Sequence, residues 1–146
     1  MRVFSTSISV LSANVVLLIG RLTVSAFMLT HGLPKLTKFT SGEAIKFADP
    51  FGLGPSITLG LTVFAEVVCS IFIILGLGTR LAAIPPMIAM GVAAFYAHAD
   101  DPFGAKEKPL LFLLIYLLFF VFGSGRYSID HLMTRNSLQP TPEPEY

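Results

Sequence analysis

Hydrophobic residues along this chain gather in four long runs, separated by short polar or Gly- and Pro-containing stretches. An α-helix of about 20 residues, rising about 1.5 Å per residue, crosses a hydrocarbon core of about 30 Å. None of the runs alternates as a strand would, and lipid does not accommodate open sheet edges. The pattern therefore predicts four membrane-spanning helices, at about Leu11 to Thr30, Ser56 to Gly78, Leu81 to Ala99 and Lys106 to Gly123.

The longest connection joins the first two runs and carries a helical signal of its own. The first helix is expected to stop near Gly32 and Pro34. Beyond it, Thr40 and Glu43 fit a capping box, and a short apolar stripe follows, formed by Ala44, Ile45, Phe47 and Ala48. We therefore expect a short interfacial helix here, lying at the membrane surface, with a structureless loop as the alternative.

The fold class that follows is all-α, an integral membrane four-helix bundle with that short interfacial helix between helices 1 and 2. Residues 11–132 form the single domain, after an N-terminal tail at 1–10. Gly76 and Gly78 are expected to end the second helix. Residues 133–146 are polar and rich in Pro and Glu, so a disordered C-terminal tail is expected.

Composition supports the membrane reading and excludes several classes of protein. Charged residues make up 13% of the 146 residues, about half the roughly 25% of soluble domains, and mean hydropathy is +0.74. The net charge of +1 with no basic block indicates no nucleic-acid partner. The single cysteine, Cys69, rules out an internal disulfide, a CxxC pair or an iron–sulfur ligand set. We expect no metal site and no intrinsic cofactor, so any redox role needs a partner's electrons.

Two opposite charges fall inside the predicted spans at matching depth. Arg21 lies ten residues before His31, at the end of the first helix, and Glu66 lies ten residues after Ser56, at the start of the second. Ten residues span about 15 Å, so both charges lie near the midplane. A lone charge there costs about 2.5–3.5 kcal/mol on insertion scales. We therefore predict an Arg21–Glu66 ion pair inside the bundle, which could line a ligand or proton site or serve only to fix helix register.

Polar and small residues continue from these charges at helical spacing, so these stripes should face protein or water rather than lipid. Helix 4 is apolar nearly all round, with Tyr116 as its one buried polar side chain. The stripes comprise Arg21, Ser25, Met28 and Gly32 on the first helix and Thr62, Glu66 and Ser70 on the second.

A second polar group gathers on the side opposite the termini, where helices 1 and 3 end and helices 2 and 4 begin. His31 and His98 both lie at helix exits and could approach each other. Two histidines could ligate a haem, or exchange protons with a quinone, because imidazole titrates near neutral pH. Both readings stay open, beside a third in which the histidines only cap helix ends at the membrane interface. The group comprises His31, Lys35, His98, Asp100, Asp101, Lys106 and Glu107.

The order of these features resembles the DoxX family of small four-helix membrane proteins. The matching stretches are Gly20-Arg21, His31-Gly32, Lys35-Leu36, Ala65-Glu66, residues 75–81, His98 with Asp101-Pro102-Phe103, and residues 125–130. Proteins similar to this one include the membrane subunit of a thiosulfate:quinone oxidoreductase, and other relatives are linked to complexes that handle thiol and oxidative stress. The positions that match family motifs are Arg21, His31, Glu66, Arg80 and His98.

The residues and the resemblance together favour a membrane oxidoreductase subunit, linked to quinone. Glu66 and His98 would exchange protons, and Arg21, His31 and Tyr116 would surround the quinone. A membrane or soluble redox protein would supply electrons. A non-catalytic scaffold subunit is the main alternative. A third is a small proton-coupled carrier, for which four helices without a repeat give little basis.

Location and assembly follow from the same features. The expected location is the lipid bilayer of the bacterial inner membrane, as a multi-pass protein. An even number of spans puts both termini on one side, which we take as the cytoplasm. Assembly into a homo-oligomer is a further expectation.

Overall fold

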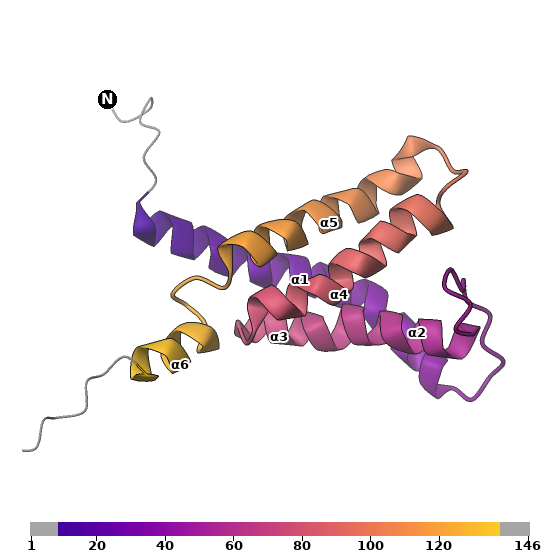
Figure 1. Ribbon diagram of the computed structural model, residues 1–146, viewed down its shortest axis with the longest axis horizontal. Coiled ribbons are helices and arrows are strands. Elements are labelled where there is room, and N and C mark those ends of the chain that lie inside the picture. The colour runs from indigo at the N-terminus through magenta and orange to yellow at the C-terminus, as the bar shows by residue number, and fades with distance from the viewer. Residues whose placement is uncertain (1–8, 138–146) are drawn as a thin grey trace, which may run out of the picture.

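The computed structural model describes residues 9–137, and all regular elements of this part of the chain are helices, without strands (Figure 1). The elements are α1 (Val10–Thr40), α2 (Pro55–Val63), η1 (Phe64–Val68), α3 (Cys69–Leu75), α4 (Thr79–Val92), η2 (Ala93–Ala97), α5 (Phe103–Phe122) and α6 (Ile129–Ser137). Some of them join into longer helical rods: α2, η1 and α3 form the second rod, and α4 and η2 form the third. In each of these two rods the π-helical segment continues the helix without a break.

Three of the described helical rods are long and apolar enough to cross a membrane: Val10–Thr40, Pro55–Leu75 and Thr79–Ala97. This confirms a membrane helical bundle. The fourth rod, α5, carries three charged residues within its first two turns, at 106–108, and its long apolar part is the stretch Pro109–Phe122. Its contact with α4 is the most extensive contact between two elements of the described chain. A fourth span at α5 stays a prediction, and this packing supports it.

The first helix does not stop at Pro34, contrary to the prediction, and continues to Thr40. A proline inside a helix costs about 3 kcal/mol, because it lacks an N–H and crowds the preceding turn. Packing offsets that cost: Leu29 and Leu36, on either side of Pro34, both pack against a core cluster of Leu59, Val63 and Val67.

The interfacial helix is also absent: within the described chain, residues 41–54 form a loop. Its apolar residues are still used, since Ile45 and Phe47 pack against the same core cluster. The carboxylate of Asp49 accepts hydrogen bonds from the backbone N–H groups of Leu53 (3.0 Å) and Gly54 (2.7 Å) and from the Thr58 hydroxyl (2.9 Å). The Asp49 side chain thus fixes the loop to the start of α2, in the connection where a short helix was expected.

The two ends of the bundle differ (Figure 1). The start of α1, the α3–α4 turn and α6 lie at one end, here called the terminal end; the loop 41–54 and the α4–α5 turn lie at the other, the loop end. Gly76 and Gly78 adopt left-handed conformations (φ 67° and 57°) and end the second rod as predicted. Helix α6 extends to Ser137 and so includes the first five residues of the segment expected to be disordered. Residues 1–8 and 138–146 of the two predicted tails lie outside the described residues.

Candidate functional site

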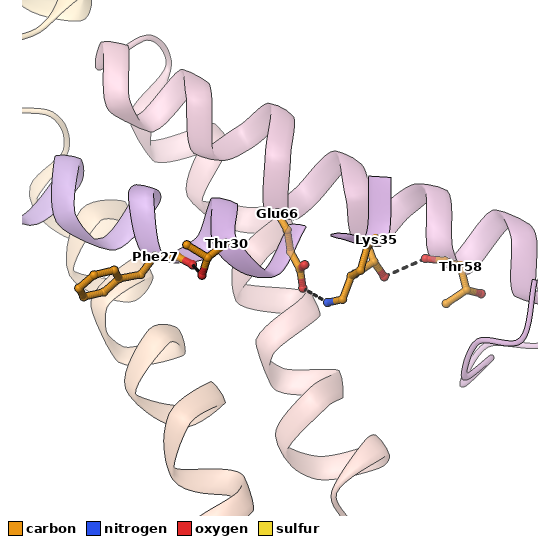
Figure 2. A network of polar contacts seen from close by, with 6 residues as sticks. Phe27, Thr30, Lys35, Thr58 and Glu66 are labelled. Carbon is orange, nitrogen blue, oxygen red and sulfur yellow. Dashed lines mark hydrogen bonds and ion pairs between the residues drawn. The ribbon is translucent and has the colours of Figure 1, made fainter. Parts of the chain in front are cut away.

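Glu66 forms its ion pair with Lys35, not with Arg21. The Glu66 side chain is 1% exposed, and its Oε1 lies 2.5 Å from the Lys35 Nζ, whose side chain is 31% exposed. Figure 2 shows the Lys35 side chain reaching from α1 to the carboxylate. Lys35 lies on the part of α1 that continues past Pro34. Its ammonium therefore enters from the loop end of the bundle while its stem follows the helix.

Arg21 is fully buried elsewhere, near the terminal end. Its two terminal nitrogens donate to the backbone carbonyls of Ile73 (3.2 Å) and Tyr127 (2.5 Å). The guanidinium also lies against Gly76, where a Cβ would collide with it. Arg21 therefore ties α1 to the end of α3 and to the segment before α6, and the predicted Arg21–Glu66 pair is wrong.

The error has one physical source, the length of α1. The prediction paired the end of α1 at His31 with the start of α2, but the helix ends nine residues later, at Thr40. Nine residues correspond to about 14 Å along the axis. The second rod therefore lies further along α1, towards Thr40, than the prediction placed it. Gly32 lies opposite Glu66, with only 3.0 Å between a Cβ added at Gly32 and the Glu66 Cβ, and Arg21 lies opposite Ile73.

A cavity of about 490 Å³ lies beside Glu66, between α2–η1 and α4–η2. We call it the lateral cavity. Most of its wall is apolar, and the loop residues Phe47 and Phe51 cover part of it. Its polar side chains are few: Lys35, Thr58, Thr62, Glu66 and His98. Several of its wall residues are exposed on the lipid-facing surface: Leu61 (53%), Phe64 (48%) and Ile88 (57%).

A second cavity of about 360 Å³ lies on the other side of Glu66, towards α5. We call it the axial cavity. Met90, Pro109 and Phe112 form its inner wall. The charged and titratable side chains that line it are His31, Lys35, Glu66, His98 and Lys108.

Two π-helical segments flank the lateral cavity. In η1, the backbone N–H of Cys69 bonds to the carbonyl of Phe64, and in η2 that of His98 bonds to Ala93 (3.0 Å). Each segment inserts a residue into its helix and often marks a functional position. Glu66 lies within η1, and His98 directly follows η2. Hydropathy carries no signal for such a segment, so the sequence analysis missed both.

The two histidines line one cavity without being equivalent. The Nδ1 of His98 lies 2.7 Å from Asp101 Oδ2. A carboxylate at Nδ1 favours the proton on that nitrogen and leaves Nε2 as the acceptor of a neutral ring. The His31 ring packs edge-on against Phe112, with 6.0 Å between centroids. No group of three or more His, Cys, Asp or Glu side chains suited to a metal ion occurs within residues 9–137.

Tyr116 is fully buried, as predicted, but it lines neither cavity. Its ring packs between Phe112 and Phe119, and its hydroxyl approaches Ser70 on the side of Glu66. The predicted stripes are buried too, including Ser25, Met28 and Gly32 on α1 and Ser70 on α3. Within the described residues, the hydroxyls of Ser25, Ser70 and Tyr116 and the Oε2 of Glu66 have no hydrogen-bond partner.

Of the residues predicted for the site, the structure brings together Glu66, His98 and His31, and it leaves Arg21 at the far end and Tyr116 behind Glu66. The sequence analysis placed Lys35 in a polar group at a helix exit and in a matching family stretch, but did not assign it to Glu66. A helix continuing through Pro34 would have indicated its role, because Lys35 then lies at the depth of Glu66. The contribution of residues 47–51 to the cavity wall had no signal in the sequence.

Comparison with known proteins agrees with this architecture. The chain is 27% identical over 95 residues to an uncharacterized protein of Haemophilus influenzae; the match covers 62% of this chain and 63% of that protein's length. This chain therefore spans less than two thirds of that relative. No solved structure matches the chain. The DoxX family profile matches residues 16–99, from α1 to just beyond η2. Since this is more than half of the sequence, the chain belongs to the DoxX family.

Proposed function

We propose that this protein is the membrane subunit of a quinone-linked redox complex. The quinone head group would bind in the lateral cavity against Glu66 and His98, and a partner protein would supply electrons. One observation carries the proposal: a carboxylate that is 1% exposed stands in the wall of an apolar cavity of about 490 Å³. A buried ionisable side chain in a membrane helix is costly and marks a functional site by default.

The size and surroundings of the cavity support a lipid-soluble ligand. Small-molecule sites generally occupy about 300–1,000 Å³ and combine apolar walls with a few placed polar groups. The exposed side chains of Leu61, Phe64 and Ile88 face the acyl chains, so a ligand dissolved in the bilayer would enter between α2 and α4. The loop anchored by Asp49 covers the cavity near the loop end.

The chain's own residues would bind and move protons. A bound quinone supplies two carbonyl oxygens that take up two electrons and two protons. Lys35 holds Oε1 of Glu66, which leaves Oε2 to accept or give a proton. His98, whose Nδ1 is engaged by Asp101, would exchange a proton at Nε2. Arg21, which the sequence placed beside the quinone, has a structural role in this proposal.

Location and assembly belong to the same proposal. We place the protein in a bacterial inner membrane, with the terminal end of the bundle in the cytoplasm. An electron-donating protein would dock from one aqueous side, or beside it in the bilayer. Association of two or more copies is compatible with the lipid-facing helices.

The test is quinone content. The protein would be purified with native lipid, its quinone extracted and quantified, and compared with Glu66→Gln. A hydrogen bond to a charged group contributes about 1.5–3 kcal/mol, so the affinity of this variant for quinone should fall by at least roughly tenfold. Glu107→Gln, which changes an exposed carboxylate at the loop end of α5, serves as the control and should match the unmodified protein. Wild-type preparations without quinone would count against the proposal.

A scaffold function is the second candidate, and the contacts of Arg21 favour it. A guanidinium that donates to backbone carbonyls of two different segments stabilises the fold, and Arg21 lines neither cavity. If the Lys35–Glu66 pair were equally structural, an apolar pair of similar volume should replace it at little cost. A Lys35→Met, Glu66→Leu double variant that folds and supports full complex activity would favour the scaffold over the quinone site.

A further inference from the structure

The two cavities meet at one place. Both the lateral and the axial cavity are lined by Lys35, Glu66, Ala93 and His98. Glu66 therefore stands between two spaces, and it belongs to the wall of each. The ion pair with Lys35 engages Oε1, and within the described chain Oε2 has no partner.

The outer walls of the two cavities face different surroundings. The lateral cavity opens between α2 and α4 through exposed apolar side chains such as Leu61 and Ile88. The axial cavity reaches the loop end of the bundle, where His31, Gly104 and Lys108 are exposed. Imidazole and ammonium groups are strongly hydrated and lie at the membrane–water boundary rather than among acyl chains.

Charge distinguishes the cavities as well. Four basic or titratable side chains line the axial cavity (His31, Lys35, His98 and Lys108) against one carboxylate. Positive charge of this kind draws in water and anions and concentrates field lines in a narrow cleft. The lateral cavity shares two of these groups but adds no further cation.

We propose that the axial cavity is a separate aqueous entrance, through which protons reach Glu66 while a lipid-soluble ligand enters through the lateral cavity. This inference rests on the proposed function. In the step concerned, a protonated His31 or His98 gives its proton to the Glu66 carboxylate, which leaves a neutral imidazole that takes its next proton from the water outside. Separate entrances would let one carboxylate take protons from water and deliver them to a ligand that water does not reach.

Two adjacent residues of α4 offer a matched test. Ala89 lines the lateral cavity but not the axial one, whereas Met90 lines the axial cavity but not the lateral one. Ala89→Cys and Met90→Cys would each be made in a Cys69→Ala background, because Cys69 is the chain's one cysteine. Each variant, in membrane vesicles, would be treated with a membrane-impermeant sulfonated methanethiosulfonate and, separately, with a lipid-soluble maleimide.

The expected result is opposite selectivity at neighbouring positions. A thiol in apolar surroundings keeps its proton, and each unit of raised pKa lowers the reactive thiolate about tenfold. Met90→Cys should therefore react with the sulfonated reagent at least about tenfold faster than Ala89→Cys, which should prefer the lipid-soluble maleimide. Adding Lys108→Glu should slow the anionic reagent at position 90 and speed a cationic analogue.

Equal rates at the two positions, or slower sulfonate labelling at position 90, would overturn the inference. If Met90→Cys fails to fold, hydroxyl-radical labelling of the unmodified protein gives the answer: Met90 should be oxidised much faster than Met28, which is fully buried. Equal oxidation would contradict it. Quinone-free preparations with the labelling pattern intact would refute the proposed function alone, whereas quinone present with equal labelling would refute only the second entrance.

Discussion

The Nζ of Lys35 lies 2.5 Å from the Oε1 of Glu66, across the contact between α1 and η1. The pair links α1, which continues through Pro34, to the second rod, which contains the π segment η1. Two irregular helices therefore meet at this ion pair. Because Lys35 is 31% exposed and Glu66 is 1% exposed, the pair spans the boundary between solvent and core. Substitutions of Lys35 and of Glu66 should therefore change the stability of the protein by different amounts.

Lys35→Met should destabilise the protein, because it leaves the Glu66 carboxylate buried without its counter-ion. Breaking a fully buried pair costs about 3–5 kcal/mol, and the partial exposure of Lys35 should bring this cost below that range. The measurement is the thermal unfolding midpoint in detergent. Lys46→Met, which removes an exposed ammonium from the loop, is the control. A Lys35→Met, Glu66→Leu double variant should recover most of the lost stability; no recovery would contradict this account.

Arg21→Lys should lower stability without changing the amount of quinone bound per folded molecule. The guanidinium serves two carbonyls on different segments, Ile73 and Tyr127, and a single ammonium does not reproduce that fork. A buried group left without its hydrogen bond costs about 1–3 kcal/mol. Unfolding in detergent and quinone extraction measure the two effects. Loss of quinone with stability preserved would instead indicate that Arg21 belongs to the ligand site.

Gly32→Ala should force α1 away from η1. A Cβ at this position would lie 2.7 Å from Val67 Cγ2 and 3.0 Å from Glu66 Cβ, which is closer than van der Waals contact allows. Overpacking of this kind costs about 1–3 kcal/mol. Gly91→Ala is the matched control, because nothing lies within 4 Å of a Cβ there. It should be neutral, or raise stability by up to about 1 kcal/mol through helix propensity. Equal effects at the two glycines would show that the α1–η1 contact is loose.

The helices could be predicted from hydropathy because lipid selects apolar segments by composition and length. The buried faces could be predicted as well, since polar residues such as Arg21, Ser25 and Glu66 are excluded from the lipid surface. Which residues of neighbouring helices lie opposite each other could not be predicted. This pairing depended on where α1 ends, and a local rule for Pro34 was overridden by the packing of Leu36 on a neighbouring rod.

The candidate site was predicted in part for the same reason. Glu66 and His98 stand out as polar residues in or at the ends of apolar helices, and the structure places both in one cavity wall. The partner of Glu66 depended on the pairing and was therefore wrong. The π segments and the loop wall arise from tertiary packing, and single-residue propensities do not encode them.

Asp49 should make stability depend on pH in the acid range. Its hydrogen bonds, above all from the Gly54 N–H and also from Thr58 and Leu53, lower the pKa of this carboxyl in the folded protein. A group with a lowered folded pKa stabilises fully above its unfolded value, which is about 3.9 for Asp. That contribution is lost as the pH falls through the folded pKa, because protonation then occurs in both states. Unfolding midpoints measured from pH 7 down to about pH 3 should therefore fall for the unmodified protein.

Asp49→Asn separates this contribution from the other carboxyls. The variant should be less stable at pH 7, because the amide offers one acceptor oxygen where Leu53, Gly54 and Thr58 now share two. Its curve should approach that of the unmodified protein as the pH falls, since both then lack the charge. Asp100→Asn, at an exposed carboxyl in the α4–α5 turn, should leave the difference between pH 7 and acid unchanged. Parallel curves for Asp49→Asn and the unmodified protein would show that the loop is held by the apolar contacts of Ile45 and Phe47 rather than by the charge of Asp49.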